Sequence, residues 1–434
     1  MHHRSIRMSA LAAAMLAALP GTAWAIRVDY TLDAGIERNN NVALTAENPI
    51  EERIWRTGLG FVVSEDTSTV QAALDGRIDY RDYPDNVFSD SVDSTFNGRV
   101  NWNVLPERLS FVFEDNLQME PVDALVPDAP ANRQRVNVLS LGPNAYFRWS
   151  PTLQAQAELR YIDTNAEVTD EFNSGRVSAA FRVAREFSPT DRLSFNAQAQ
   201  RVDFDHDDLA RDHNRYDLFA RYTRLLAHFD LGVDLGYSRI DYRGAENTSE
   251  PLARVDIGWN ATSRSRLALH AASQFLDTAT DALSGVGTLA ETVPENIITG
   301  TTVINASPYR TRRLELAYTY AGARTNLSVA PRRERRDYLD ADEFDQDLEG
   351  VDATVSWLAR PHVRLGLAAS HERNEFYRTG RDFRTRRFAA SVQYTWNRNW
   401  SMGFEVSRYQ RRTNEPGLNV SQNVAYLNIT YRNR

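Results

Sequence analysis

Three features of the sequence predict an all-β fold, a closed antiparallel transmembrane β-barrel of about twenty strands. Apolar and polar residues alternate, as in residues 229–238, which read FDLGVDLGYS, so a strand there has one apolar and one polar face. About twenty such segments follow an N-terminal leader. Mean hydropathy is only −0.51, as expected when every second residue of a membrane-spanning strand faces lipid.

Residues 1–25 have the organisation of a secretory signal peptide. Arg4 and Arg7 give a cationic start, residues 8–19 form a short apolar stretch, and Ala-Trp-Ala at 23–25 is a small-x-small cleavage site. No later apolar run approaches the ~20 residues that a membrane helix needs. We therefore expect residues 26–434 to form a single outer-membrane β-barrel domain.

Turn-forming residues divide the chain into strands. Short reversals between alternating runs are predicted at 105–107, 150–152, 188–191, 227–228, 321–323, 359–362 and 397–399, with longer ones near 64–68 and 261–265. These hairpins, with one further strand at each end (about 27–38 and 419–431), predict twenty strands, with eighteen as the alternative. The even number is typical of single-chain bacterial barrels.

Longer polar connections alternate with the short turns, at 82–91, 118–134, 163–173, 203–213, 277–300, 333–348 and 413–418. Short turns at one end and long loops at the other are typical of outer-membrane barrels, in which the turns face the periplasm. The loop 277–300 is the longest and carries several apolar residues. We expect it to fold into or over the mouth of the barrel as a constriction.

Charged residues of both signs occupy the polar faces in mid-strand. An arginine that faces lipid at mid-bilayer costs about 2–4 kcal/mol, so we expect these residues to line a water-filled lumen. They are Asp75, Arg77, Arg99, Glu158, Arg160, Arg182, Asp217, Arg221, Asp234, Arg254, Asp256, Glu315, Arg364 and Glu405.

Aromatic residues gather at strand ends beside the short turns. Amphipathic rings prefer the lipid–water boundary, so this distribution predicts an aromatic girdle and favours a membrane barrel over a soluble β-sandwich. The girdle residues are Trp102, Trp149, Phe187, Trp259, Tyr320, Trp357, Trp396 and Trp400.

The composition excludes several classes of site. The chain has no cysteine, so it has no disulfide, thiolate metal site or cysteine nucleophile, and its net charge of −8 argues against nucleic acid as a partner. Two acidic loops, at 203–213 with His206 and His213 and at 337–347, are interpreted as solvated surface rather than metal sites. For the second loop, contact with lipopolysaccharide phosphates is the functional alternative.

No residues indicate catalysis or a cofactor. His270 and His371 lie on different predicted strands, and neither can be paired with a particular serine. The lumen is then the functional element, with amides such as Gln154, Gln156 and Asn101 among its charges. This wall suits a hydrated polar solute such as a sugar chain, or it is a structural lumen with no substrate; the residues alone leave both open.

Residues 30–42 (YTLDAGIERNNNV) resemble the start of the β-barrel porin 2 group, whose members often begin with a strand that ends in a DN(V/I) turn. Segments 55–61 and 74–80, and the Ser-Pro-Thr turns within 149–153 and 187–193, are also similar to that group. The resemblance implies an outer-membrane barrel that works with exopolysaccharide or PEP-CTERM systems. No catalytic residues are carried over from it.

These observations together predict an outer-membrane porin-like channel that exports a hydrated polysaccharide. A general or solute-specific diffusion porin, and a structural or adhesin barrel without a conducting pore, are the alternatives. The expected partners are outer-membrane lipid, lipopolysaccharide, the barrel assembly machinery and a periplasmic polysaccharide export protein.

Overall fold

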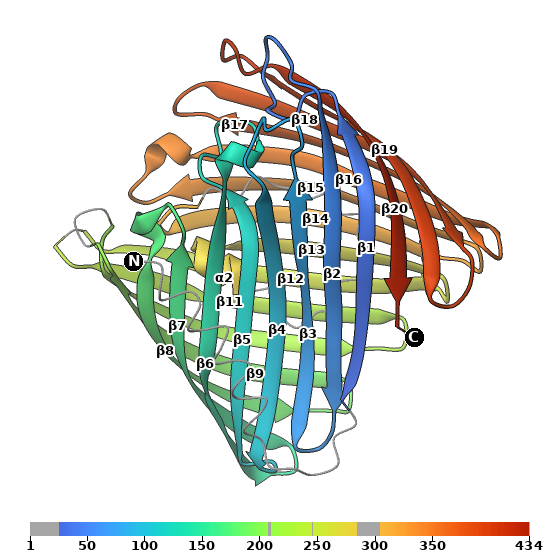
Figure 1. The fold of residues 1–434 in the computed structure, drawn as a ribbon. Coiled ribbons are helices and arrows are strands. Elements are labelled where there is room, and N and C mark those ends of the chain that lie inside the picture. The colour runs from blue at the N-terminus through green and yellow to red at the C-terminus, as the bar shows by residue number, and fades with distance from the viewer. Residues whose placement is uncertain (1–25, 207–209, 245, 284–303, 434) are drawn as a thin grey trace.

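The chain forms one closed barrel of twenty antiparallel strands (Figure 1). The computed structural model describes residues 26–206, 210–244, 246–283 and 304–433. The strands are β1 (Arg27–Asn39), β2 (Glu52–Asp66), β3 (Val70–Asp82), β4 (Ser91–Leu105), β5 (Leu109–Pro121), β6 (Arg133–Ser150), β7 (Leu153–Ala166), β8 (Ser174–Glu186), β9 (Asp191–Phe204), β10 (His213–Leu225), β11 (Phe229–Tyr242), β12 (Thr248–Thr262), β13 (Ser265–Leu276), β14 (Tyr309–Ala321), β15 (Thr325–Tyr338), β16 (Gln346–Arg360), β17 (Val363–Phe376), β18 (Arg381–Thr395), β19 (Trp400–Thr413) and β20 (Val420–Arg432).

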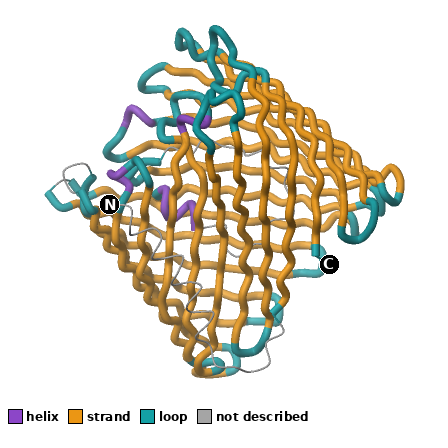
Figure 2. The backbone as a smooth tube through the Cα atoms, in the orientation of Figure 1, coloured by secondary structure: helices purple, strands orange, loops and turns teal. Residues whose placement is uncertain are grey.

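Helices are few and short. The helix α2 (Thr278–Leu283) follows β13, and the 3-10 turns are η1 (Pro130–Asn132), η2 (Asp170–Phe172) and η3 (Asp342–Phe344). All of them lie on the side of the long loops (Figure 2). Within the part of the chain that the structure describes, no helix is both long enough and apolar enough to cross a membrane.

Each strand pairs with its neighbour in the sequence, and β1 pairs with β20 to close the ring. The closing register joins Leu32 to Tyr431 and Thr31 to Arg432. Beyond the last strand, the Asn433 side chain donates a hydrogen bond to the Val28 carbonyl at 3.1 Å. The prediction of twenty strands, rather than eighteen, is confirmed.

The two ends of the barrel differ in the way that the turn pattern predicted. Short turns join β2 to β3, β4 to β5 and so on to β18 and β19, and the longer segments between the other strand pairs gather at the opposite end (Figure 2). We call these the turn end and the loop end. In outer-membrane barrels the loop end is extracellular and the turn end is periplasmic.

The two faces of each strand also differ. In β11 the Leu235 side chain is 61% exposed, whereas its neighbour Asp234 is 1% exposed. In β2, Glu52, Ile54 and Arg56 are buried, while the alternate residues are exposed. Large apolar residues therefore cover the outer wall, and polar residues cover the inner wall, which is the reverse of a soluble sandwich.

The interior is filled at the loop end and more open at the turn end. In β10, His213, Arg215 and Asp217 are buried near the loop end, whereas Arg221 and Thr223 further along the same face are half-buried. The apolar clusters of the described residues also lie near the loop end, where residues from loops pack against the inner wall. The barrel is thus narrowed at the loop end.

Candidate channel lumen

Contacts across the barrel identify which face of the strands points inward. Arg176 on β8 contacts Asp277, which follows β13, and Val138 on β6 packs against residues of α2. Segments this far apart around the ring can meet only across the interior. The charged residues predicted to line the lumen lie on this same face: Arg160, for example, stands between Leu159 and Tyr161, which are both exposed on the outer wall.

The first group of charges surrounds Arg77 on β3. Its guanidinium donates to the Asp33 carboxylate on β1 at 2.9 Å and to Asp79 at 2.7 Å. The Arg77 side chain reaches β1 by passing over Gly58 on β2, where a Cβ would lie 2.6 Å from Arg77 Nη2. The glycine on the intervening strand therefore permits an ion pair between strands that are not neighbours.

A second group is centred on Asp234, which is buried between two arginines. The Asp234 carboxylate accepts from Arg221 Nε at 2.6 Å and from Arg254 Nη1 at 3.2 Å. Arg254 also lies over the Phe219 ring, 5.3 Å from its centre. Three of the predicted residues thus form one ladder across β10, β11 and β12.

The other predicted residues are distributed around the inner wall, and most have a polar partner there. Arg99 pairs with Glu114, Arg160 with Glu158, Asp217 with Arg215, and His270 with Asp256, and Arg182 donates to Asn196. Glu315, Arg364 and Glu405 share the same face on β14, β17 and β19. The lining therefore consists mainly of paired charges.

Two further ladders were not predicted from the sequence. Arg332 on β15 pairs with Glu372 on β17 at 2.6 Å and also contacts Asp352. Glu334 on β15 accepts from Arg313 at 2.9 Å and pairs with Arg336. The alternate residues Arg332, Glu334 and Arg336 change in sign along the strand and were the available signal, but the predicted connection 333–348 covers residues 333–336.

The loop 122–132 reaches β19, which is six strands away around the ring from β5. Arg411 on β19 donates to the carbonyl oxygens of Val126 and Leu125, each at 2.7 Å. Leu125 packs against Phe376 and Phe383. Arg411 is buried by these contacts, so it holds the loop against the inner wall at the loop end.

The loop after β13 crosses the interior in the same way. The Arg176–Asp277 ion pair is buried, with side chains 2% and 7% exposed. Asp277 Oδ1 also accepts from the backbone N–H groups of Ala279 and Thr280, each at 3.1 Å, which fixes the start of α2. We call this arrangement the Asp277 latch.

Residues of α2 pack deep against the inner wall. Ala279 belongs to one apolar cluster with Val136, Val138 and Ile304, and Leu283 packs against it. Val138 is the sixth residue of β6, so this contact lies about 16 Å along the strand from its loop end. Residues on both sides of the undescribed part of this loop, such as Ala279 and Ile304, therefore pack inside the barrel. Residues 284–303 of the predicted constriction lie outside the described residues.

The Asp277 latch has a predicted pH dependence. Burial alone would raise the pKa of the Asp277 carboxyl, but Arg176, the Thr280 hydroxyl and Arg215 lower the pKa below its usual value. The ionised Asp277 carboxylate therefore stabilises docking of the loop at any pH above the pKa of the undocked group, which is about 4. This stabilisation is lost as the pH falls from about 4 toward the lower pKa of the docked group.

Titration of Asp277 should therefore leave single-channel conductance unchanged between about pH 5 and pH 8, and should raise it below about pH 4. The rise should be absent in Asp277→Asn, which has no carboxyl to titrate. An equal acid-induced rise in both proteins would show that other groups control the opening.

The predicted girdle residues lie at or beside the short turns. Trp149, Phe187, Trp259, Trp357, Trp396 and Trp400 are exposed, as expected for rings at the edge of a lipid-facing wall. Trp102 and Tyr320 are half-buried. Trp102 stacks at a tilt on Phe111, 6.3 Å between ring centres, which accounts for its lower exposure.

The histidines do not gather into a site. His213, which the sequence placed in an acidic loop, is instead the first residue of β10 and packs between Phe204 and Tyr242. His270 is bonded to Asp256 at 2.6 Å rather than isolated. Residues 207–209 of the acidic loop lie outside the described residues. Among the described residues, no group of three or more acidic, histidine or cysteine side chains could hold a metal ion.

Comparison by sequence finds no match, whereas comparison by structure finds many. No protein-family model and no curated protein matches this chain. The FrpB iron transporter from Neisseria meningitidis (F5-1 variant) superposes with a TM-score of 0.52 at 9% identity, over 94% of this chain and 82% of that one.

Two Pseudomonas aeruginosa proteins are also similar in structure. A double mutant of the ferric enterobactin receptor PfeA gives a TM-score of 0.50 at 11% identity, over 94% of this chain and 80% of that one. OpdK with vanillate gives 0.39 at 10% identity, over 94% and 98%. At such identities the likeness concerns the fold. The chain is an outer-membrane β-barrel, and it shares its fold with the FrpB iron transporter and the ferric enterobactin receptor.

Proposed function

We propose that this barrel conducts a hydrated polysaccharide across the outer membrane, from the periplasmic turn end outward. The observation that carries the proposal is the chemistry of the inner wall at the turn end. Amide side chains lie on the inner faces of β4, β7 and β9, from the middle of the barrel toward the turn end: Asn97, Asn101, Asn103, Gln154, Gln156, Asn196 and Gln198. We call them the amide stripe.

The amide stripe suits a sugar chain because amides donate and accept hydrogen bonds without carrying charge. Gln156 is half-buried and donates to Glu158 at 2.9 Å, which leaves its amide oxygen for a solute. The charges of the wall are largely paired with one another. A ring of one sign would select ions, whereas paired charges and amides favour a neutral, hydrated polymer.

The resemblance of the N-terminal segment to the β-barrel porin 2 group supports export of an exopolysaccharide in particular. On this proposal a periplasmic polysaccharide export protein delivers the polymer to the turn end. The narrowed loop end then acts as the gate through which the polymer leaves. No catalytic residue or cofactor is part of the proposal.

A planar-bilayer experiment tests the proposal directly. Neutral oligosaccharide added on the side of the turn end should interrupt the ion current, and residence times should fall severalfold in Gln154→Ala/Gln156→Ala. The outer-wall variant Leu159→Ala on the same strand is the matched control and should behave as the wild type.

Three outcomes separate the functions. Interrupted current, with loss of secreted polymer in a deletion strain, supports polysaccharide export. A steady current unaffected by oligosaccharide, with reduced small-solute uptake after deletion, identifies a diffusion porin and contradicts the proposal. No current in the wild type or in Asp277→Asn, which lacks the Asp277 latch, identifies a structural barrel and also contradicts the proposal.

A further inference from the structure

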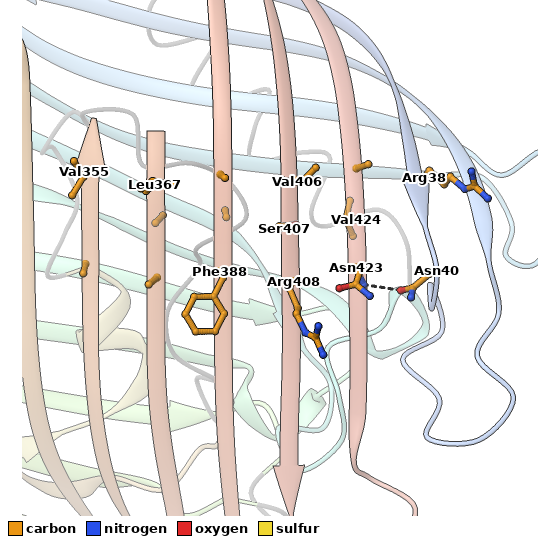
Figure 3. Close-up of a pocket in the computed structure, with 16 residues that line it drawn as sticks. Arg38, Asn40, Val355, Leu367, Phe388, Val406, Ser407, Arg408, Asn423 and Val424 are labelled. Carbon is orange, nitrogen blue, oxygen red and sulfur yellow. Dashed lines mark hydrogen bonds between the residues drawn. The ribbon is translucent and has the colours of Figure 1, made fainter. Parts of the chain in front are cut away.

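The outer wall carries an apolar groove of about 770 Å³ that crosses six neighbouring strands, β16 to β20 and β1. Figure 3 shows its lining, from Val355 and Leu367 at one end, through Phe388 and Arg408, to Asn40 and Arg38 at the other. Leu367 is 61% exposed on the outer wall, so the groove opens toward lipid and not into the lumen. It is separate from the proposed transport path.

Small residues form the floor of this groove. Ala369, Ala390 and Ala425 lie on the outer faces of β17, β18 and β20, between the larger side chains of Leu367 and Phe388. Strands in such barrels tilt by about 35–45°, so a groove across them runs obliquely along the wall. A flexible acyl chain fits this shape and chemistry.

Two arginines line the part of the groove that is formed by β19, β20 and β1. In the register, Arg408 on β19 faces Asn423 on β20, and Arg38 on β1 faces Ala425 on β20. Figure 3 shows Asn423 and Asn40 between the two guanidinium groups, joined by the Asn423 backbone N–H donating to Asn40 Oδ1 at 2.6 Å. The groove thus has an apolar part and a cationic part.

Some arginines on the outer wall near the loop end pair with a carboxylate two residues along the same strand, as in Arg201–Asp203, Arg239–Asp241 and Arg373–Glu375. Arg408 has no acidic partner among the described residues, and Arg38 contacts Glu51 in an exposed pair that contributes little energy. The guanidinium group of Arg408 is therefore available to an external anion, and the weak Arg38–Glu51 pair can be replaced by one.

The position of the two arginines near the loop end indicates that the groove contacts the outer leaflet of the membrane. Arg38 is the next-to-last residue of β1, at the loop end, and Arg408 lies in the half of β19 toward the same end. At this level the wall leaves the acyl region and meets the headgroups. Guanidinium groups bind phosphate oxygens with strong, charge-assisted hydrogen bonds.

We propose that this groove is a binding site for a phosphorylated glycolipid of the outer leaflet, of the lipid A class. Arg38 and Arg408 hold a phosphate, and an acyl chain lies along the alanine floor. The bound lipid would cover the apolar groove.

Lipid retention by the folded, full-length protein tests the proposal. Wild-type protein reconstituted with lipid A in phosphatidylethanolamine vesicles, then re-extracted, should retain about one lipid A per chain by native mass spectrometry. Retention should fall at least severalfold in Arg38→Ser/Arg408→Ser, and also in Ala390→Trp, which fills the groove. Arg239→Ser removes an outer-wall arginine of another strand and should retain the lipid.

Further retention measurements distinguish lipid A from other molecules that could fill the groove. Lipid A lacking its phosphates should be retained poorly by the wild type, and inorganic phosphate should not displace intact lipid A. Equal retention by all folded variants would overturn the proposal. So would a stable dimer whose contact is broken by Ala390→Trp, because a second copy would then occupy the groove.

Discussion

Replacing the loop between β13 and β14 with a short turn is expected to raise single-channel conductance severalfold. Leu276 and Tyr309 face each other across the two strands, so a tight turn can join them without altering the barrel. The deletion removes α2 and the apolar contacts that it makes with Val136 and Val138 on the inner wall. Planar-bilayer recording of the purified protein measures the effect.

The point variant Asp277→Asn should open the channel through the same loop while retaining its length. Removing one partner of a buried ion pair costs about 3–5 kcal/mol, which changes the ratio of docked to undocked loop by at least about a hundredfold. The matched control is Asp340→Asn, which breaks the more exposed Arg211–Asp340 pair at the same end. Unchanged conductance in both the deletion and Asp277→Asn would refute the constriction.

Replacing Leu235 with arginine is expected to prevent assembly of most of the protein in the outer membrane. Leu235 lies at the middle of β11 and is 61% exposed on the outer wall. An arginine facing lipid at this depth costs about 2–4 kcal/mol, which is a large fraction of the stability of a typical domain. The heat-modifiable folded form on gels measures the loss.

Gln198→Arg is the matched control for Leu235→Arg. Gln198 is exposed on the inner face of β9, next to Asp217 on β10. Water in the lumen and the nearby carboxylate can accommodate the added charge there. We expect a normal amount of folded barrel, and equal loss in the two variants would contradict the assignment of the faces.

The strand pattern was predictable because it is local. The first strand was expected at 27–38 and is Arg27–Asn39, and the last was expected at 419–431 and is Val420–Arg432. Side chains alternate between lipid and lumen along every strand, so a few residues suffice to identify each one. The turn residues then fixed the hairpins.

Two loops were predicted too long for a physical reason. Predicted connections at 118–134 and 333–348 are 122–132 and 339–345 in the structure, whereas the connection predicted at 277–300 extends to residue 308. The strands beside the first two loops continue beyond the apolar band, where both faces are polar. The inner-face residues Arg332, Glu334 and Arg336 of β15, for example, alternate in charge. Alternation of hydropathy stops where the lipid stops, but the hydrogen bonding does not.

The contacts that shape the interior could not be predicted because they are not local. Arg176 and Asp277 are 101 residues apart, and the Arg411 guanidinium meets the Val126 carbonyl over 285 residues. Neither residue type nor spacing indicates such partners in a single sequence. The sequence therefore indicated the inner face of the strands and a constriction by the loop 277–300, but not the ion pairs and hydrogen bonds that hold this loop and the loop 122–132 in the barrel.

Alternation of environment along one strand is the most direct test of the account. The chain contains no cysteine, so single cysteines introduced in turn at residues 231–235 of β11 report each position separately. Labels at 231, 233 and 235 should be quenched by lipid-borne quenchers, whereas position 232 should be reached only by water-soluble reagents and position 234, which is 1% exposed, should react poorly with either. Water-soluble labelling at 235, or no alternation at all, would contradict a barrel with an apolar outer wall and a charged, aqueous lumen.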